Sequence, residues 1–318
     1  MKADTASRAS LLQASDLSRV YRGGKGVSSV SLSVEAGEVV GLMGPNGSGK
    51  TTLLRMLATA STPTSGGVSW FGSSNPRDPS VRRRLGVVLD QAAHFDQMTG
   101  YQNAWFFARQ FGLSSDLARS RLDELFQWAG IADARDQLVR EYSLGMRRRL
   151  NLIEALVHRP QILLLDEPTL ALDYRAELGL IERLQLLTLT GTAVVLATND
   201  VHLAERLCDR ILFLHQGRVI REGRVPELMT ELAGSKEVQL QMSSPVPLEK
   251  LRGLPAVQAA NVEGDTVHIV LARGANPADV LSILNGTADL VSTMRVRRPN
   301  LGDLFLKLTG VALPTTHE

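Results

Sequence analysis

Short apolar runs alternate with helical patterns over the first two thirds of the chain. Val39–Leu42 has the composition of a buried strand, and Thr52–Leu57 has helical spacing directly after a glycine-rich turn. Ile162–Leu165 and Ala193–Ala197 have the length and composition of central parallel strands. Tyr101–Trp128 repeats apolar residues at helical intervals. This alternation favours an α/β domain built on a parallel sheet.

The pattern changes near Leu232–Ser235, where a second region begins. Its predicted elements follow the order βαββαβ, which is typical of a ferredoxin-like unit. They are the strand Glu237–Met242, the helix Leu248–Leu251, the strands Val257–Val262 and Thr266–Leu271, the helix Pro277–Leu284 and the strand Leu290–Arg297. We expect a last helix, Asn300–Gly310, to close this unit. The predicted domains are residues 16–232 and 236–310, with tails at 1–15 and 311–318.

Composition adds limits to this picture. The 318 residues are 44% hydrophobic and carry a net charge of +2, which gives no strong nucleic-acid signal. We expect the triplets Arg82–Arg84 and Arg147–Arg149 to face solvent, phosphate-bearing neighbours or an acidic partner. The single cysteine, Cys208, fits a reducing compartment and is expected to pack. No run reaches the ~20 apolar residues of a membrane span. Residues 1–15 lack a signal peptide's apolar centre and are expected to be disordered.

The glycine-rich turn between the first strand and helix has the spacing of a phosphate-binding P-loop, Gly44-Pro-Asn-Gly-Ser-Gly-Lys-Thr51. Its glycines permit close backbone approach, so that consecutive N–H groups converge on a phosphate at the helix N-terminus. Lys50 would neutralise the β- and γ-phosphates, and the Thr51 hydroxyl would be a ligand for Mg²⁺. The predicted ATP-binding residues here are Gly44, Asn46, Gly47, Ser48, Gly49, Lys50, Thr51 and Thr52.

Two adjacent carboxylates end the apolar run that begins at Ile162. Asp166 would hold Mg²⁺, directly or through water, and Glu167 would act as general base toward the attacking water. An acidic pair after a strand also occurs at the start of an ordinary loop. The P-loop upstream on a strand of the same sheet favours the catalytic interpretation.

Between these elements the chain reads Tyr142-Ser-Leu-Gly-Met-Arg-Arg-Arg-Leu150, followed by a helical pattern. This segment resembles the signature motif of ABC-type ATPases, and the loop Ala171–Asp173 matches the same family. The resemblance, which covers about Leu17 to Gly223, implies that Ser143 and Gly145 bind the γ-phosphate held by another subunit. Leu144 replaces the first glycine of that motif. Without the other motifs, Ser143 would be an ordinary helix N-cap.

The resemblance assigns further roles by position. Tyr21 matches the aromatic residue on which adenine stacks, and Asp173 belongs to the ATP-binding set. The glutamine that senses Mg²⁺ and couples to the membrane partner falls at Asp90 in one register and at Gln91 in another. We favour Gln91, since a carboxylate beside the γ-phosphate would repel it. Asn199 stands where the family usually has a histidine; an amide cannot titrate, which puts fast hydrolysis in doubt.

The family implies an α/β P-loop NTPase fold with an antiparallel β subdomain and a helical subdomain over about residues 92–158. The loop 92–99 is either solvated or a docking site for the permease. The ending Asn300–Gly310 is similar to that of ATPase subunits of ABC-2-type exporters. We therefore expect a homodimeric, MgATP-dependent ATPase beneath a separate permease at the cytoplasmic face of the membrane, with no nucleic-acid partner.

Three alternatives remain at this stage. A nucleotide-gated ABC module with little turnover would explain Asn199. A soluble ABC ATPase would normally carry two cassettes or a long coiled coil. A small-molecule kinase would lack Ser143, Gly145 and the loop Ala171–Asp173.

Overall fold

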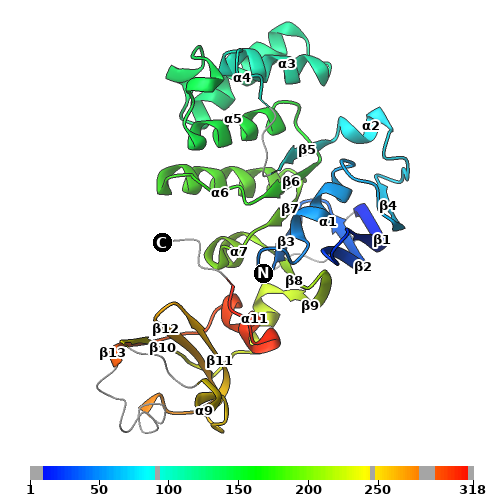
Figure 1. Cartoon of the computed structure of the whole chain (residues 1–318). Helices are drawn as coiled ribbons and strands as arrows, with labels where there is room; N and C mark the ends of the chain where they lie inside the picture. Colours follow the sequence, from blue (N-terminus) through cyan, green and yellow to red (C-terminus); the bar gives the residue numbers. More distant parts are fainter. Residues whose placement is uncertain (1–9, 90–93, 244–247, 279–290, 314–318) are drawn as a thin grey trace, which may run out of the picture.

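A six-stranded sheet forms the centre of the large domain in the computed structural model, which describes residues 10–89, 94–243, 248–278 and 291–313 (Figure 1). The strand order is β5-β6-β7-β3-β8-β9, parallel except for the antiparallel pair β8 and β9. The strands are β3 (Val39–Met43), β5 (Leu85–Val88), β6 (Ile162–Asp166), β7 (Ala193–Ala197), β8 (Arg210–His215) and β9 (Arg218–Arg224). This confirms the predicted α/β fold with a parallel core.

A three-stranded antiparallel sheet with the order β2-β1-β4 covers one side of the core. Its strands are β1 (Ser10–Val20), β2 (Gly26–Glu35) and β4 (Ser65–Trp70). The predicted tail at residues 1–15 is therefore wrong from Ser10 onward. Leu12 and Ala14 are buried on the core side of β1, which pairs with a strand on each side. Buried and exposed residues alternate at the start of this strand, but its many polar side chains obscured that pattern in the sequence.

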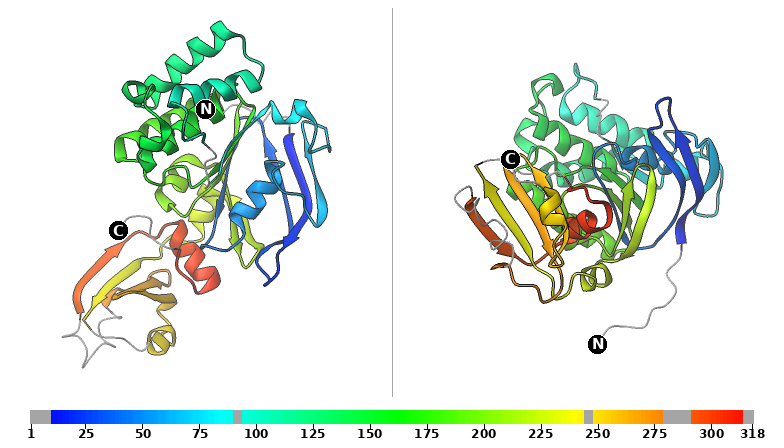
Figure 2. Two further views of the ribbon diagram at one scale, coloured as in Figure 1. Left: turned by 45° about the horizontal axis from the view of Figure 1, so that its top comes forward. Right: turned by 60° about the horizontal axis from the view of Figure 1, so that its bottom comes forward.

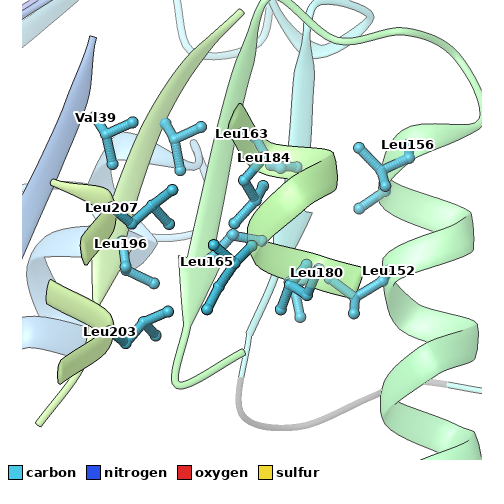
Figure 3. Packing of buried hydrophobic residues seen from close by; sticks show 14 of the residues in the cluster. Val39, Leu152, Leu156, Leu163, Leu165, Leu180, Leu184, Leu196, Leu203 and Leu207 are labelled. Carbon is cyan, nitrogen blue, oxygen red and sulfur yellow. The ribbon is translucent and has the colours of Figure 1, made fainter. Parts of the chain in front are cut away.

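Helices cover both faces of the six-stranded sheet. Helix α1 (Lys50–Leu57) lies between the two sheets (Figure 2). The opposite face packs against leucines of three helices, among them Leu152, Leu180 and Leu203 (Figure 3). The other elements are α2 (Pro79–Arg82), α3 (Gly100–Gln110), α4 (Ser115–Trp128), the 3-10 turns Ala132–Ala134 and Val139–Glu141, α5 (Leu144–Leu156), α6 (Tyr174–Leu189), α7 (Val201–Leu207) and α8 (Val225–Thr230).

The C-terminal region contains a four-stranded antiparallel sheet with the order β11-β12-β10-β13. This is the strand order of the predicted βαββαβ unit. Its elements are β10 (Glu237–Met242), α9 (Leu248–Arg252), β11 (Val257–Glu263), β12 (Thr266–Leu271) and β13 (Val291–Arg297). The predicted helix Pro277–Leu284 falls mainly outside the described residues.

The last helix, α11 (Leu301–Thr309), connects the two regions (Figure 1). An Asn300 capping box starts it, and Gly310 ends it with a left-handed φ of 73°. Leu304 and Phe305 belong to the main core of the large domain, and the Phe305 ring lies 5.7 Å from that of Phe213. We predicted that this helix would close the small domain; instead its apolar face is divided between the two regions.

Candidate nucleotide-binding site

The turn from β3 to α1 requires glycine at several positions. Gly44, Gly47 and Gly49 have φ values of 156°, 81° and 111°, which side chains rarely adopt. A Cβ atom on Gly44 would lie 2.1 Å from the Leu214 carbonyl oxygen, and one on Gly49 would lie 2.6 Å from the Gly26 carbonyl oxygen. The glycine spacing seen in the sequence is therefore a steric requirement of this loop.

The N-terminus of α1 is prepared for an anion. Its N-cap residue, Gly49, provides no side-chain acceptor, so the first-turn N–H groups, those of Thr51 and Thr52 among them, have no side-chain cap. Ser48 is 3% exposed, and its hydroxyl has no hydrogen-bond partner in the described part of the chain. Unpaired donors and the positive end of the helix dipole meet at one place, which suits a phosphate group.

Lys50 is buried at the centre of the site. Its Nζ donates to the Gly44 carbonyl oxygen at 2.5 Å and to Asn199 Oδ1 at 2.8 Å, and it lies 3.9 Å from Glu167 Oε1. Burial lowers the pKa of Lys50, whereas the charges of Glu167 and Asp166 raise it. Desolvation thus opposes an ammonium ion that the two carboxylates favour, and a phosphate would add a further favourable charge.

Glu167 follows β6 in a strained conformation. Its φ of 44° is left-handed, which costs a non-glycine residue about 1–3 kcal/mol. The carboxylate accepts hydrogen bonds from Thr198 Oγ1 at 3.3 Å and from the Asn199 N–H at 3.4 Å. Burial raises the pKa of Glu167, and the Lys50 charge lowers it. A raised pKa makes this carboxylate a better proton acceptor, as a general base requires.

Asn199 connects the end of β7 to the P-loop. Its side chain is buried; Oδ1 accepts from Lys50, and Nδ2 donates to Asn46 Oδ1 at 3.1 Å. The next residue, Asp200, caps α7 by accepting from the Leu203 N–H at 3.0 Å. The amide therefore occupies the position that the resemblance gives to histidine, in contact with both Lys50 and the P-loop.

Asp166 lies at the carboxyl end of β6, is 2% exposed and pairs in register with Ala197 of β7. The charge of Asp166 raises the pKa of Lys50, which precedes Thr51 in the first turn of α1. A carboxylate and a hydroxyl, both hard oxygen donors, thus come from adjoining elements of the same sheet edge.

The signature residues belong to the other face of the sheet. Ser143 is the N-cap of α5 and accepts from the Met146 N–H at 3.2 Å. Gly145 lies so close to the loop before α6 that a Cβ would be 2.7 Å from the Ala171 carbonyl oxygen. Asp173 caps α6 and forms an ion pair with Arg149; its hydrogen bond from the Ala176 N–H lowers its pKa. Helices α1 and α5 pack in separate cores on opposite faces of the sheet.

Two remaining predictions concern the edges of the site. Tyr21 directly follows β1 and is 41% exposed, and Arg19 Nε donates to its hydroxyl at 3.1 Å. An exposed ring in the large domain suits base stacking, which stays a prediction. Asp90 and Gln91 both lie outside the described residues, so the register of the glutamine also stays a prediction.

The prediction that Arg147–Arg149 face solvent, phosphate or an acidic partner was wrong for Arg148. Its guanidinium is buried and donates to the carbonyl oxygens of Asp166 and Glu167, and to that of Leu89 at 3.0 Å. One feature of the sequence does indicate that Arg148 is buried. Arg148 is four residues before Leu152, and thus on the buried stripe of α5.

Comparisons with known proteins agree with this geometry. Residues 27–170 match the model of the ABC transporter family. The chain is 35% identical to the Nod factor export ATP-binding protein I of Rhizobium etli, over 93% of this chain and 92% of that protein. It is 37% identical to the daunorubicin/doxorubicin resistance ATP-binding protein DrrA of Streptomyces peucetius, over 94% and 92%.

Solved structures give the same result. An ATP-binding subunit of an ABC transporter superposes with a TM-score of 0.65 at 28% identity, covering 70% of this chain and 92% of that one. The post-hydrolysis dimer of the ATP-binding cassette MJ0796, bound to ADP and Pi, gives 0.62 at 28% identity, covering 67% and 98%. The chain is an ATPase that belongs to the ATP-binding subunits of the ABC transporter family.

Proposed function

We propose that this chain is the ATP-hydrolysing subunit of an ABC-2-type exporter and acts as a homodimer with two shared ATP sites. The observation that carries the proposal is the separation of Lys50 and Ser143 onto opposite faces of one sheet. A second copy related by a two-fold axis would bring its Ser143 and Gly145 to the first copy's P-loop, and the reverse.

Exposed apolar residues support a partner on the signature side. Leu144, Leu170 and Tyr174 are 68%, 63% and 76% exposed, and all three flank the contact between Gly145 and Ala171. Apolar side chains clustered in this way are typical of a surface that another protein covers. Leu144 itself, the departure from the family pattern, would then contribute packing area to the dimer.

Mg²⁺ fits the residues at the sheet edge. The Thr51 hydroxyl and the Asp166 carboxylate would hold the ion together with phosphate oxygens, since Mg²⁺ is commonly bound by one or two carboxylates plus substrate phosphates. The ion would neutralise charge that develops on the phosphates. Gln91 would be a further ligand, and Glu167 would accept the proton of the attacking water.

Export through a separate permease rests on the relatives. They are named for Nod factor export and for daunorubicin/doxorubicin resistance, and they match nearly the whole chain, the C-terminal region included. No helix in the described ranges combines the length and apolarity of a membrane span. We therefore place the homodimer beneath an ABC-2-type permease, at the cytoplasmic face of the membrane.

A low-turnover, nucleotide-gated module is the second candidate, and one observation favours it. The Asn199 amide is already engaged by Lys50 and Asn46 and carries no titratable proton. In that case ATP binding would close the dimer, and slow hydrolysis would only reset it.

The dimer is tested with Glu167→Gln, which removes the general base and keeps the side-chain volume. With MgATP, this variant should elute as a dimer in size-exclusion chromatography, whereas Lys50→Ala should remain a monomer. A Glu167→Gln protein that stays monomeric while hydrolysing ATP normally would contradict the assignment.

Shared sites are tested by mixing Lys50→Ala and Ser143→Arg protomers. In a heterodimer both lesions fall into one composite site, and the other site is intact. The mixture should therefore hydrolyse ATP faster than either variant alone. Absence of recovery, with heterodimers shown to form, would argue against shared sites.

A further inference from the structure

Arg148 joins the signature helix to the catalytic carboxylates through the main chain. It lies on α5, five residues after the N-cap Ser143, and its guanidinium is 7% exposed. One nitrogen donates to the carbonyl oxygens of both Asp166 and Glu167, and another donates to that of Leu89 at 3.0 Å. One side chain thus holds the carboxyl ends of two neighbouring strands, β5 and β6.

The strand end that Arg148 holds is the strained one. Glu167 has a left-handed φ of 44°, and such a conformation persists only where the surroundings enforce it. This turn directs the Glu167 carboxylate toward Lys50, Thr198 and the Asn199 N–H. Donation to two consecutive carbonyl oxygens favours this turn over an extended path. Arg148 therefore helps to fix where the catalytic carboxylate lies.

We propose that Arg148 is a positioning residue that couples the placement of the signature helix to the orientation of Glu167. The inference rests on the proposed shared site, in which a nucleotide held by the partner engages Ser143 and thereby moves or fixes α5. Because Arg148 is on the same helix, that movement reaches the Asp166–Glu167 main chain directly. Through its hydrogen bond to Leu89, Arg148 would pass the same movement to strand β5, which precedes residues 90–93.

The role is geometric, because the hydrogen bonds go to main-chain oxygens and leave the carboxylates for Lys50 and the ion. A planar guanidinium can donate in several fixed directions at once, whereas an ammonium on a flexible stem cannot reproduce that fork. Misplacing a catalytic group by about 1 Å can cost 10²-fold in rate without a change in the chemistry. Loss of Arg148 should thus lower kcat and leave the proton affinity of Glu167 unchanged.

The test compares Arg148→Gln and Arg148→Lys with the wild type and with Arg119→Gln. Arg119 is an exposed control in the same helical region, where it forms a surface pair with Asp116. For each protein we would measure ATP affinity, phosphate release from pH 6 to 9, and the thermal midpoint. Arg148→Gln should lower kcat by about 10- to 100-fold with an unchanged pH profile. Its ATP affinity should change by less than about twofold. Arg148→Lys should be intermediate, and Arg119→Gln should match the wild type.

Three results would overturn the inference: wild-type turnover in folded Arg148→Gln, loss of folding in both variants, or a fall in ATP affinity that accounts for the loss of rate. The separate Glu167→Gln variant distinguishes this failure from failure of the proposed function. If Glu167→Gln does not dimerise with MgATP, the shared site is wrong. If it dimerises while Arg148→Gln hydrolyses ATP normally, only the coupling role is wrong.

Discussion

Replacing Asn199 by histidine should accelerate ATP hydrolysis. In the structure the neutral amide nitrogen, Nδ2, donates to Asn46 Oδ1, and the amide oxygen, Oδ1, accepts from Lys50 Nζ. An imidazole would reach further toward a γ-phosphate and could orient the attacking water.

The gain can be bounded from hydrogen-bond energies. A neutral hydrogen bond contributes a net of about 1 kcal/mol and one to a charged group about 1.5–3 kcal/mol. Exchanging the first for the second in the transition state therefore gains roughly 0.5–2 kcal/mol. With 1.36 kcal/mol per tenfold in rate, this corresponds to about 2- to 30-fold. The full loss of one such donor, about 2.7–4 kcal/mol, sets the ceiling.

The assay is steady-state phosphate release by the purified protein, with ATP affinity measured in parallel. Asn199→His should raise kcat and leave affinity nearly unchanged, because Lys50 and the P-loop carry most of the binding. Asn199→Ala is the matched control and should not exceed the wild-type rate. Fast turnover by the wild type, with no gain in Asn199→His, would show that the amide already performs this role, and the low-turnover candidate would fall.

Three further predictions concern Lys50, Tyr21 and His158. Lys50→Ala should lower kcat by ~10²-fold or more in the same assay, since it removes a preorganised charge; equal rates at saturating MgATP would refute this. Tyr21→Ala should weaken ATP binding by about 1 kcal/mol in calorimetry while Tyr21→Phe does not, if the exposed ring stacks on adenine. His158 follows α5 and stacks on the Phe111 ring with centroids 3.6 Å apart, and burial lowers its pKa to about 4. The fold favours the neutral ring, so acidification from pH 6.5 to 5 should lower the free energy of unfolding by about 1.5 kcal/mol in urea titrations. His158→Gln should remove that dependence; an unchanged slope would contradict it.

Much of the nucleotide site could be predicted from the sequence, because its residues are held by local rules. The P-loop glycines are required by backbone sterics within one turn, and Asp166 ends an apolar run that only a buried strand explains. Arg148 could not be predicted in the same way. Its partners are main-chain oxygens more than fifteen residues away, and three consecutive arginines look alike until α5 packs.

The boundaries of the domains were harder to predict for a related reason. Strand β1 begins at Ser10 because Leu12 and Ala14 are buried by strands and core residues that come later in the sequence. Helix α11 divides its apolar face between two regions, which its amphipathic pattern alone does not reveal. The helix was visible in the sequence although its partners were not, whereas the start of the strand was missed because its partners were unknown.

The placement of α11 has a consequence for how the protein is made. Domains generally fold as units from the N-terminus during synthesis. Here Phe213, on strand β8 of the large domain's sheet, packs against Phe305, and the Leu301 N–H donates to Glu205 Oε1 at 2.8 Å. The apolar surface around Phe213 therefore stays open during synthesis until residues 301–309 have been translated and α11 can dock. A message cut short before the codons of α11 would yield a large domain with that surface exposed, which favours association with other proteins.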